Sequence, residues 1–207
     1  MKQKEEYPIS SIGRLRMGND GPGIRTLIVL YGCPLRCRYC INPYTWDNSH
    51  KPKMMTAGEL YDSIVIDRPY ILATNGGITF GGGEPLLYPG LINEMRALCE
   101  PEMSFYAETS FNDEWESIEA VAGSVDCFYV DVKSVDPDVY KDYTGGELEP
   151  VLENIRRYVE LKNPDSIIVR IPEIPGMVDK EKQKQAKKIL SEMGVTRFNL
   201  FKYVLPT

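Results

Sequence analysis

Six short apolar segments alternate with helical segments along almost the whole chain, and this alternation limits the fold more than any other feature. The segments are rich in β-branched and aromatic residues, which favour strands, and they lie at Thr26–Gly32, Ile78–Phe80, Ser104–Thr109, Cys127–Lys133, Ser166–Ile171 and Arg197–Tyr203. Strands separated by helices predict a parallel sheet with right-handed crossovers. Since no linker, repeat or low-complexity stretch interrupts the pattern, we expect one α/β domain over residues 1–207.

The helical segments between these strands have clear start and stop signals. One begins near Thr56, where Thr56 and Glu59 form a T-x-x-E capping box. A charged amphipathic helix is expected over Asp179–Met193, with Gly194 as its stop signal. Further helices are expected near Pro89–Cys99, Asp113–Ala122 and Glu149–Leu161, with a short turn-helix before the last of these.

Three cysteines directly follow the first predicted strand. Cys33, Cys37 and Cys40 have C-x3-C-x2-C spacing, and there is no fourth cysteine nearby. Thiolates at this spacing on one tight loop can converge on three corners of a four-iron cluster. The fourth iron then has no protein ligand, and an open coordination position is typical of a reactive metal site. Such an iron can bind a small molecule and pass an electron to it.

Composition narrows the class of protein further. Five cysteines, an odd number with three of them clustered, argue against a disulfide framework and for a reducing cytoplasm. Cys99 and Cys127 lie in apolar patterns and are expected to be buried packing residues. A net charge of −6 and a pI near 5.0 argue against a nucleic-acid partner. No apolar run suits a membrane span or a secretory signal, so we expect no membrane association.

Unusual residues gather where the predicted strands end. In a parallel sheet these ends share one edge, which is where functional residues collect. Each group has a plain structural explanation as well: a flexible turn, a solvated strand end or a surface ion pair. Their common location favours a site, which holds the three cysteines after the first strand, Gly81, Gly82, Gly83 and Glu84 after the second, Glu108 and Thr109 on the third, Asp131, Val132 and Lys133 on the fourth, and Arg170 on the fifth.

Several stretches of the chain resemble one family. GCPLRCRYC after a strand, with GGGEP about forty residues later, resembles the radical S-adenosylmethionine (radical SAM) superfamily. More narrowly, the chain is similar to glycyl-radical-enzyme activases of the pyruvate formate-lyase activating type over roughly residues 8–203. The stretches that carry this narrower resemblance are Asp20–Thr26 (DGPGIRT), Cys40–Asp47 (CINPYTWD), Asn75–Leu87 (NGGITFGGGEPLL), Asp131–Lys133 (DVK) and Val169–Gly176 (VRIPEIPG).

The resemblance implies a fold and two cofactors. The fold is a partial, open parallel β/α barrel of about six strands, shortened at its C-terminus. A [4Fe–4S] cluster on the three cysteines binds S-adenosylmethionine and cleaves it to a 5′-deoxyadenosyl radical. The expected S-adenosylmethionine contacts are Tyr39 beside the adenine, carbonyl groups of Gly82 and Gly83 for the amino group, Glu84 as support of that loop, and Asp131, Lys133 and Arg170 near the ribose and carboxylate.

The resemblance also implies a cation, a substrate and an electron donor. A monovalent cation is expected at Glu108 and Asp131, although the family more often has Asp where this chain has Glu108. The substrate is a glycyl-radical enzyme, and the electron comes from flavodoxin or ferredoxin, because the chain has no cysteines for accessory clusters. Where the family has a C-terminal His, this chain has Val204.

Two alternatives to an activase stay open on the sequence alone. A radical SAM enzyme that acts on a peptide or a small molecule would use the same cluster and cofactor residues. A zinc protein would use the three cysteines with His50, the one histidine of the chain, as a closed tetrahedral site.

Overall fold

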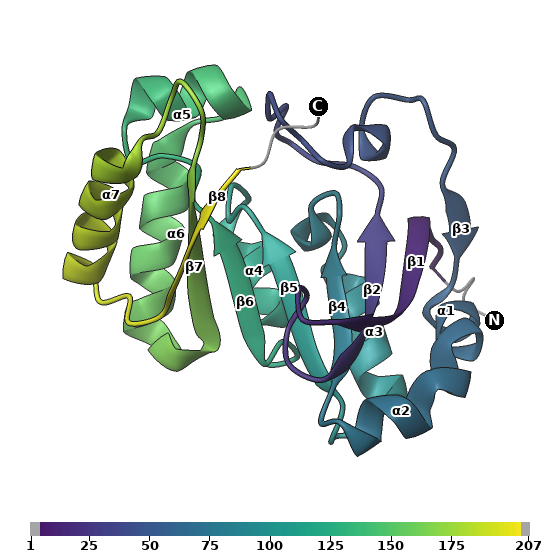
Figure 1. Ribbon diagram of the computed structural model, residues 1–207. Coiled ribbons are helices and arrows are strands. Elements are labelled where there is room, and N and C mark those ends of the chain that lie inside the picture. The colour runs from purple at the N-terminus through teal and green to yellow at the C-terminus, as the bar shows by residue number, and fades with distance from the viewer. Residues whose placement is uncertain (1–4, 204–207) are drawn as a thin grey trace. The chain divides into compact units, whose positions relative to one another are not determined.

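The computed structural model describes residues 5–203, which form two compact units that are interleaved along the chain (Figure 1). Val204, the position where the family's histidine was expected, lies outside the described residues. The prediction of a single domain stays a prediction, and each unit is described by itself. Unit 1 comprises residues 5–33, 42–108 and 116–126, and unit 2 comprises residues 34–41, 109–115 and 127–203.

Unit 1 is built on five strands in the order β3-β1-β2-β4-β5. The strands β2, β4 and β5 pair in parallel, whereas β1 pairs in antiparallel fashion with β2 and with β3. The last residue of β5 belongs to unit 2. The strand bounds are β1 (Tyr7–Met17), β2 (Ile24–Leu30), β3 (Lys53–Met55), β4 (Gly77–Gly81) and β5 (Ser104–Thr109).

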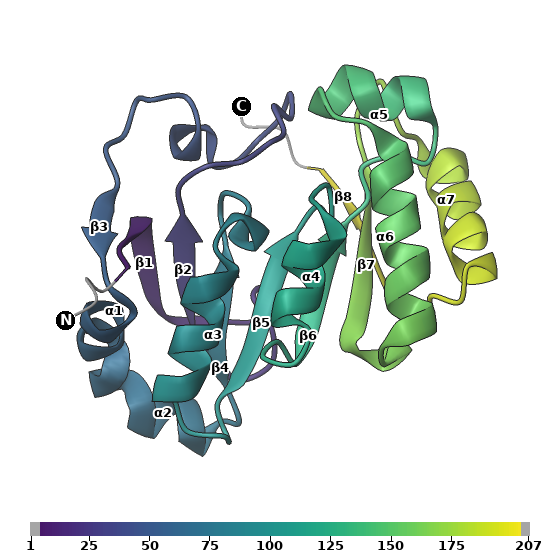
Figure 2. The ribbon, with the colours of Figure 1, turned by 180° about the vertical axis from the view of Figure 1, so that it is seen from behind.

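The parallel strands of unit 1 form its core. Ile28 on β2 is in register with Phe80 on β4, and Phe80 with Ala107 on β5, and all three are fully buried. Helix α3 lies behind these strands in Figure 1 and in front of them in Figure 2, so it covers one face of the sheet. The helices are α1 (Ala57–Ile64), α2 (Arg68–Ala73), α3 (Pro89–Leu98) and α4 (Trp115–Val121), with 3-10 turns at Pro43–Thr45, Val65–Asp67 and Pro85–Leu87.

Unit 2 is built on three parallel strands in the order β6-β7-β8. Helix α6 buries one apolar stripe, in which the Tyr158 ring packs on Phe111 and Phe128 with centroid distances of 5.8 and 5.4 Å. The elements are β6 (Cys127–Asp131), α5 (Pro137–Thr144), α6 (Leu148–Leu161), a 3-10 turn (Pro164–Ser166), β7 (Ile167–Glu173), α7 (Lys180–Glu192) and β8 (Phe198–Lys202).

The mostly parallel α/β architecture predicted from sequence is confirmed, with two differences. All six predicted strands are present, and so are the capping box at Thr56 and the end of α7 before Gly194. Cys99 and Cys127 are buried, as expected. The described residues contain eight strands rather than six, because β1 and β3 were not predicted. They also contain α2, a helix of six residues that was not predicted.

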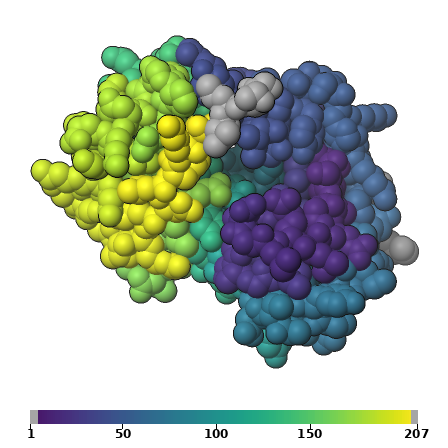
Figure 3. Space-filling view, in the orientation of Figure 1, coloured from purple at the N-terminus to yellow at the C-terminus, as the bar shows by residue number. Residues whose placement is uncertain are grey.

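The strand β1 escapes prediction because only its first residues are buried. Tyr7 and Ile9 face the core, but Arg14 and Arg16 interrupt the apolar pattern, and Met17 is 74% exposed. The purple residues of β1 and the turn after it form an exposed patch on the face shown in Figure 3. The strand β3 has three residues, two of them exposed, and is too short to give a periodic signal. In the described part of the chain no helix is long and apolar enough to cross a membrane.

One buried cation joins the parallel strands of unit 1. Arg25, at the start of β2, is 1% exposed and stacks its guanidinium 4.2 Å from the ring centre of Tyr106. It donates to Thr79 Oγ1 at 2.7 Å and to the Ile78 oxygen at 2.7 Å on β4, and to Ser104 Oγ at 2.8 Å on β5. Because every contact is internal, the side chain joins three neighbouring strands at their amino ends.

We predict that Arg25→Ala destabilises the protein by about 3 kcal/mol, because buried acceptors lose their donor. Arg156→Ala is the matched control, since Arg156 forms an exposed pair with Glu153 on the surface of α6, and exposed pairs contribute about 0–1 kcal/mol. Urea unfolding of both variants measures the difference. Equal free energies of unfolding for the two variants would contradict this role of Arg25.

Candidate functional site

The first cysteine and the glycine loop meet in unit 1. Cys33 follows β2, and the glycine loop follows β4, the parallel neighbour of β2. The Gly83 N–H donates to the Leu30 oxygen at 3.1 Å, and the Glu84 N–H donates to the Gly32 oxygen at 2.8 Å. The loop that the sequence predicted for S-adenosylmethionine therefore runs directly along the backbone that ends in Cys33.

Glycine is required in this loop because the backbones are so close. Gly82 has φ +88°, and a Cβ there would collide with the side chain of Val29. A Cβ at Gly83 would collide with the backbone oxygens of Gly32 and Leu30, which cannot move without shifting the end of β2. Both glycines thus permit an approach that any other residue would block.

Two acidic residues border this loop. Glu84 is 2% exposed, and its carboxylate accepts from the Leu86 N–H at 3.2 Å, so it caps the short 3-10 turn after the loop. The resemblance implies that Glu84 supports the glycine loop, and this role stays a prediction. Glu108, near the end of β5, lies against Gly81, where a Cβ would come within 3.3 Å of its Oε2.

The other two cysteines lie in unit 2, on a loop attached to the end of α5. The last carbonyl groups of a helix have no partner within the helix. Here the Thr144 oxygen accepts from the Arg36 N–H at 2.7 Å, and the Tyr143 oxygen accepts from the Arg38 N–H at 2.9 Å. Both bonds flank Cys37, and the Cys40 N–H donates to the Cys37 oxygen at 3.1 Å. Helix α5 therefore positions Cys37 directly.

This anchor is not evident from the sequence. The segment after Lys133 is predicted only as a turn-helix with no part in the site. The signals were present: Asp136 accepts from the Asp138 and Val139 N–H groups as N-cap, and Gly145 ends the helix at φ +73°. A sequence shows that such a helix exists, but not that a loop some hundred residues earlier binds to its end.

Aromatic side chains surround Cys37. Tyr143, Ile174 and Val178 form a buried apolar cluster, and Cys37 and Tyr39 pack against it. The Tyr39 ring lies 6.0 Å from that of Tyr143, nearly edge-on. Burial raises the pKa of the Cys37 thiol to about 11 in the metal-free protein. Because metals bind the thiolate, binding at Cys37 must release this proton.

Three charged residues predicted for the site also come together in unit 2. Asp131 and Arg170 are register neighbours on β6 and β7. Arg170 binds both carboxylate oxygens, Nε to Oδ1 at 2.7 Å and Nη2 to Oδ2 at 3.0 Å. Lys133 Nζ lies 3.1 Å from Asp131 Oδ2. The three side chains are 11–21% exposed, so this is a largely buried ionic cluster.

The side chains of the ionic cluster stay charged because the attraction between their opposite charges offsets the cost of burying each one. Burial alone would raise the pKa of Asp131, but Arg170 and Lys133 hold that pKa well below its ordinary value. Burial likewise opposes the charge on Lys133, but Asp131 keeps the pKa of Lys133 above its usual value. All three groups are therefore charged near neutral pH.

The arrangement differs from that of a closed single-metal site. In residues 5–203, no group of three or more His, Cys, Asp or Glu side chains is placed to hold one metal ion. An iron–sulfur cluster takes its thiolates on different irons, so its cysteines need not meet at one point. His50, proposed for the zinc alternative, has Nε2 3.0 Å from the Ser10 oxygen and packs edge-on against Tyr44.

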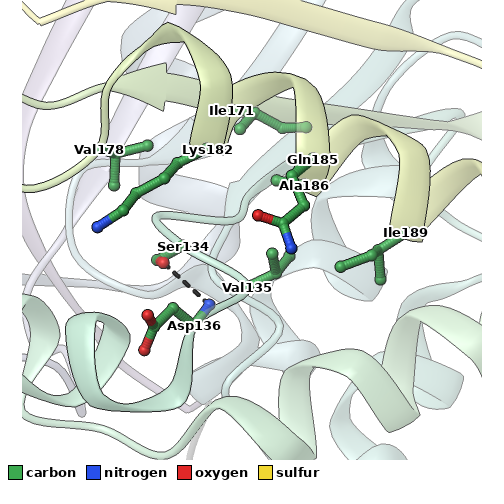
Figure 4. A pocket seen from close by; sticks show the side chains of 9 residues that line it. All are labelled: Ser134, Val135, Asp136, Ile171, Val178, Lys182, Gln185, Ala186 and Ile189. Carbon is green, nitrogen blue, oxygen red and sulfur yellow. Dashed lines mark hydrogen bonds between the residues drawn. The ribbon is translucent and has the colours of Figure 1, made fainter.

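A separate pocket of about 240 Å³ opens in unit 2 between α7 and the loop after β6 (Figure 4). Its lining includes Lys182 and Gln185 from α7 opposite Ser134 and Asp136, where Ser134 Oγ accepts from the Asp136 N–H at 3.0 Å. Asp136 is also the N-cap of α5. None of the residues predicted for the cluster or for S-adenosylmethionine lines this pocket, so we assign it no part in the chemistry.

Comparison with known proteins finds one family. Residues 27–189 match the family model described as the radical SAM superfamily. The chain is 40% identical over 139 residues to a pyruvate formate-lyase-activating enzyme of Clostridium pasteurianum, which covers 67% of this chain and 56% of that protein. It is 31% identical to the enzyme of the same name from Staphylococcus aureus strain USA300, over 95% of this chain and 80% of that protein.

Solved structures agree with the fold. SuiB of Streptococcus suis bound to S-adenosylmethionine has a TM-score of 0.66 at 17% identity, over 91% of this chain and 42% of that chain. The chain thus spans less than half of that structure and 56% of the Clostridium relative. At this identity the structural likeness supports the fold alone.

We predict that Asp131→Asn and Arg170→Gln are strongly coupled. Each single change leaves a buried charge without its bidentate partner and should cost about 3 kcal/mol, whereas the double change removes both charges. A double-mutant cycle on the metal-free protein should then give a coupling energy of about 2 kcal/mol. Additive effects would show that the observed pair contributes nothing to stability.

We also predict that Gly83→Ala destabilises the metal-free protein by about 2–3 kcal/mol, because the new Cβ must displace the backbone that carries Cys33. Gly123→Ala is the matched control, since a Cβ at Gly123 meets nothing within 4 Å. Thermal unfolding compares the two. A loss of stability in the control as large as that in Gly83→Ala would contradict the packing argument.

Proposed function

The chain belongs to the radical SAM superfamily, and we propose that it is an activase that installs a glycyl radical on a partner enzyme. Family membership implies a [4Fe–4S] cluster and S-adenosylmethionine, and makes the protein an enzyme that cleaves S-adenosylmethionine. The proposal of an activase rests on one observation, the identity of 31% to a pyruvate formate-lyase-activating enzyme over 95% of this chain.

The cysteines present fit the cluster. We assign Cys33, Cys37 and Cys40 as its three ligands, which leaves one iron for S-adenosylmethionine. Cys37 supports the assignment, since it is partly buried and lies on a loop that two backbone hydrogen bonds attach to α5. When bound, the cluster and S-adenosylmethionine supply a one-electron reductive cleavage of a carbon–sulfur bond.

In this proposal each of the other predicted residues either contacts one part of S-adenosylmethionine or supports a residue that does. The carbonyl groups of Gly82 and Gly83 accept from the amino group, and the close packing at both glycines supports this role. Tyr39 supplies an aromatic face for the adenine. Glu84 holds the glycine loop through the Leu86 N–H.

The ionic cluster binds the carboxylate and ribose in this proposal. Asp131 is shared by two cations, Lys133 and Arg170. Lys133 contacts this shared carboxylate through one oxygen, so a second anion beside Lys133 is electrostatically favoured. The carboxylate of S-adenosylmethionine has the right charge, and Arg presents paired donors that suit it.

The monovalent cation at Glu108 and Asp131 is a separate part of the proposal. Oxygen ligands suit such an ion, and Glu108 lies beside the glycine loop. Asp131 Oδ1 and Oδ2 already accept from Arg170 and Lys133, so a cation there must share those oxygens. Activity that is independent of added K⁺ or Na⁺ would remove the cation from the proposal.

The partners follow from the same proposal. The protein substrate is a glycyl-radical enzyme, and the electron donor is flavodoxin or ferredoxin in the cytoplasm. The lack of any cysteine between Cys40 and Gly81 supports an outside donor, because no cluster-bearing insertion fits there. No nucleic acid and no membrane take part in the proposed reaction.

The first test concerns S-adenosylmethionine cleavage. Anaerobically reconstituted protein, reduced with dithionite, should convert S-adenosylmethionine to methionine and 5′-deoxyadenosine. Cys37→Ala should lose this activity at least a hundredfold, because one cluster ligand is gone. Cys99→Ala is the matched control: it removes a buried cysteine outside the triplet and should retain cleavage. Wild-type rates in Cys37→Ala would overturn the cluster assignment.

The second test separates an activase from a radical SAM enzyme with a peptide or small-molecule substrate. The reduced protein is incubated with S-adenosylmethionine and candidate glycyl-radical enzymes, and EPR detects the glycyl doublet. We expect a doublet with one candidate, and its loss when that candidate's glycine is changed to Ala. Turnover of a peptide or small molecule, with no doublet from any candidate, would establish the alternative.

A further inference from the structure

The strand β8 has one edge without a partner strand. It pairs in parallel with β7, and no other strand among residues 5–203 pairs with it. The Arg197 oxygen, just before β8, accepts from the Val169 N–H on β7 at 3.0 Å. Because the backbone groups of successive residues point to opposite sides of a strand, those of Phe198, Leu200 and Lys202 point away from β7. They form a free edge of unit 2.

This edge lacks the usual protection against pairing with another chain. Proteins protect free edges with very short strands, prolines and charged residues. In unit 1 the outer strand β3 follows this rule, since it has three residues, follows Pro52 and begins with Lys53. The strand β8 has five residues, no proline and one charge, at Lys202. Its Leu200 is 42% exposed, and Figure 3 shows β8 in yellow at the surface. The edge is therefore open to strand addition.

The free edge runs beside the ionic cluster. Asp131, Arg170 and Asn199 are register neighbours on β6, β7 and β8. Register neighbours share a face of the sheet, so Asn199 lies on the face of the ionic cluster. Since neighbouring strands lie about 4.8 Å apart, a strand added to β8 would lie about 10 Å from Arg170. A segment bound at this edge is thus close to residues that the proposed function assigns to S-adenosylmethionine.

The edge is also positively charged, although the chain as a whole has a net charge of −6. Residues 193–203 contain no Asp or Glu. Lys187 on α7 is exposed, and its Nζ lies 5.5 Å from the ring centre of Phe198, whereas Lys202 is exposed at the other end of β8. Neither lysine forms an ion pair within residues 5–203, although Glu173 is the register neighbour of Lys202.

These two lysines make a second copy of the chain a poor occupant. If two β8 edges paired in antiparallel fashion about Leu200, Lys202 of each copy would lie opposite Phe198 of the other, beside Lys187. Like charges placed together across two strands are destabilising. A strand that carries carboxylates would instead be attracted by both lysines.

We propose that the free edge of β8 binds an extended, acidic segment of the protein substrate, which adds to the sheet as a further strand. The outward backbone groups supply hydrogen bonds, as in other cases of strand addition. Lys187 and Lys202 attract the carboxylates of the segment. The inference rests on the proposed function, because that function supplies a protein substrate, and it adds where the substrate docks and which charge it carries there.

The direct test is hydrogen–deuterium exchange of the reconstituted protein with S-adenosylmethionine, alone and with the glycyl-radical enzyme that gives the EPR doublet. The outward amides of Phe198, Leu200 and Lys202 should exchange rapidly in the protein alone and slow by about tenfold or more in the complex. The amides of β3 should not change. Slow exchange of the outward amides without the enzyme, or no change on binding, would overturn the inference.

Leu200→Pro removes one outward N–H and leaves the hydrogen bonds to β7 intact, because proline is tolerated where the N–H faces solvent. The Kd for the enzyme should rise about tenfold. Cleavage of S-adenosylmethionine without the enzyme should stay at the wild-type rate. Leu200→Val is the matched control, since it retains the N–H and should bind as wild type does. Wild-type affinity in folded Leu200→Pro would overturn the inference.

Charge reversal tests the acidic nature of the segment without changing the backbone. Lys187→Glu and Lys202→Glu should each raise the Kd about tenfold at low salt, and less at about 0.5 M NaCl. Lys162→Glu is the matched control, because Lys162 is exposed at the end of α6 and belongs to neither α7 nor β8. An equal rise in the control, or none in the two variants, would contradict an acidic partner at β8.

The two proposals fail in different ways. If no candidate enzyme gives a doublet, the proposed function fails, and this inference fails with it. If the doublet forms but the β8 amides and all variants behave as they do without docking, only the role of β8 fails. A dimer of the protein in sedimentation that Leu200→Pro abolishes would assign the edge to a second copy and likewise overturn the inference.

Discussion

Two backbone hydrogen bonds at the end of α5 hold the cysteine loop of unit 2, and the chemistry on that unit depends on them. They flank Cys37 and use carbonyl groups that a helix end leaves free. Asp131 and Lys133 lie at the end of β6, and the chain continues from them into α5 within a few residues. Residues expected to bind S-adenosylmethionine and the helix that positions a cluster ligand are thus neighbours in sequence.

Buried charge is the second constraint on the site. Removing three ionised side chains from water is costly, and replacing such groups with apolar residues often leaves stability unchanged or improves it. The ionic cluster of Asp131, Lys133 and Arg170 is therefore poorly explained by stability. An ion pair kept at the carboxyl ends of parallel strands, in the unit that carries the proposed cluster ligands Cys37 and Cys40, is better explained by the binding of a charged ligand.

The features that depend on a local sequence pattern could be predicted from the sequence alone. Strands such as Ile28 to Leu30 are continuous apolar runs, and the cysteine spacing is visible in the chain itself. The sequence was insufficient for β1, because Arg14 and Arg16 obscure the strand pattern. It was also insufficient for the anchoring of the cysteine loop, in which the Arg36 N–H donates to the Thr144 oxygen, because that contact joins segments about a hundred residues apart. The pairing of Asp131 with Arg170 lies between these cases. Both residues were predicted for one edge of the sheet, but only the register of β6 and β7 shows that they bind each other.

The central claim is that three cysteines leave one iron open and that S-adenosylmethionine occupies it. ENDOR spectroscopy of the reduced protein with S-adenosylmethionine labelled with ¹⁵N at its amino group tests this most directly. The account predicts a ¹⁵N hyperfine coupling strong enough for direct coordination to the cluster, and its disappearance when unlabelled cofactor replaces the label. A reduced cluster whose spectrum is unchanged by S-adenosylmethionine, with no ¹⁵N coupling, would contradict the claim.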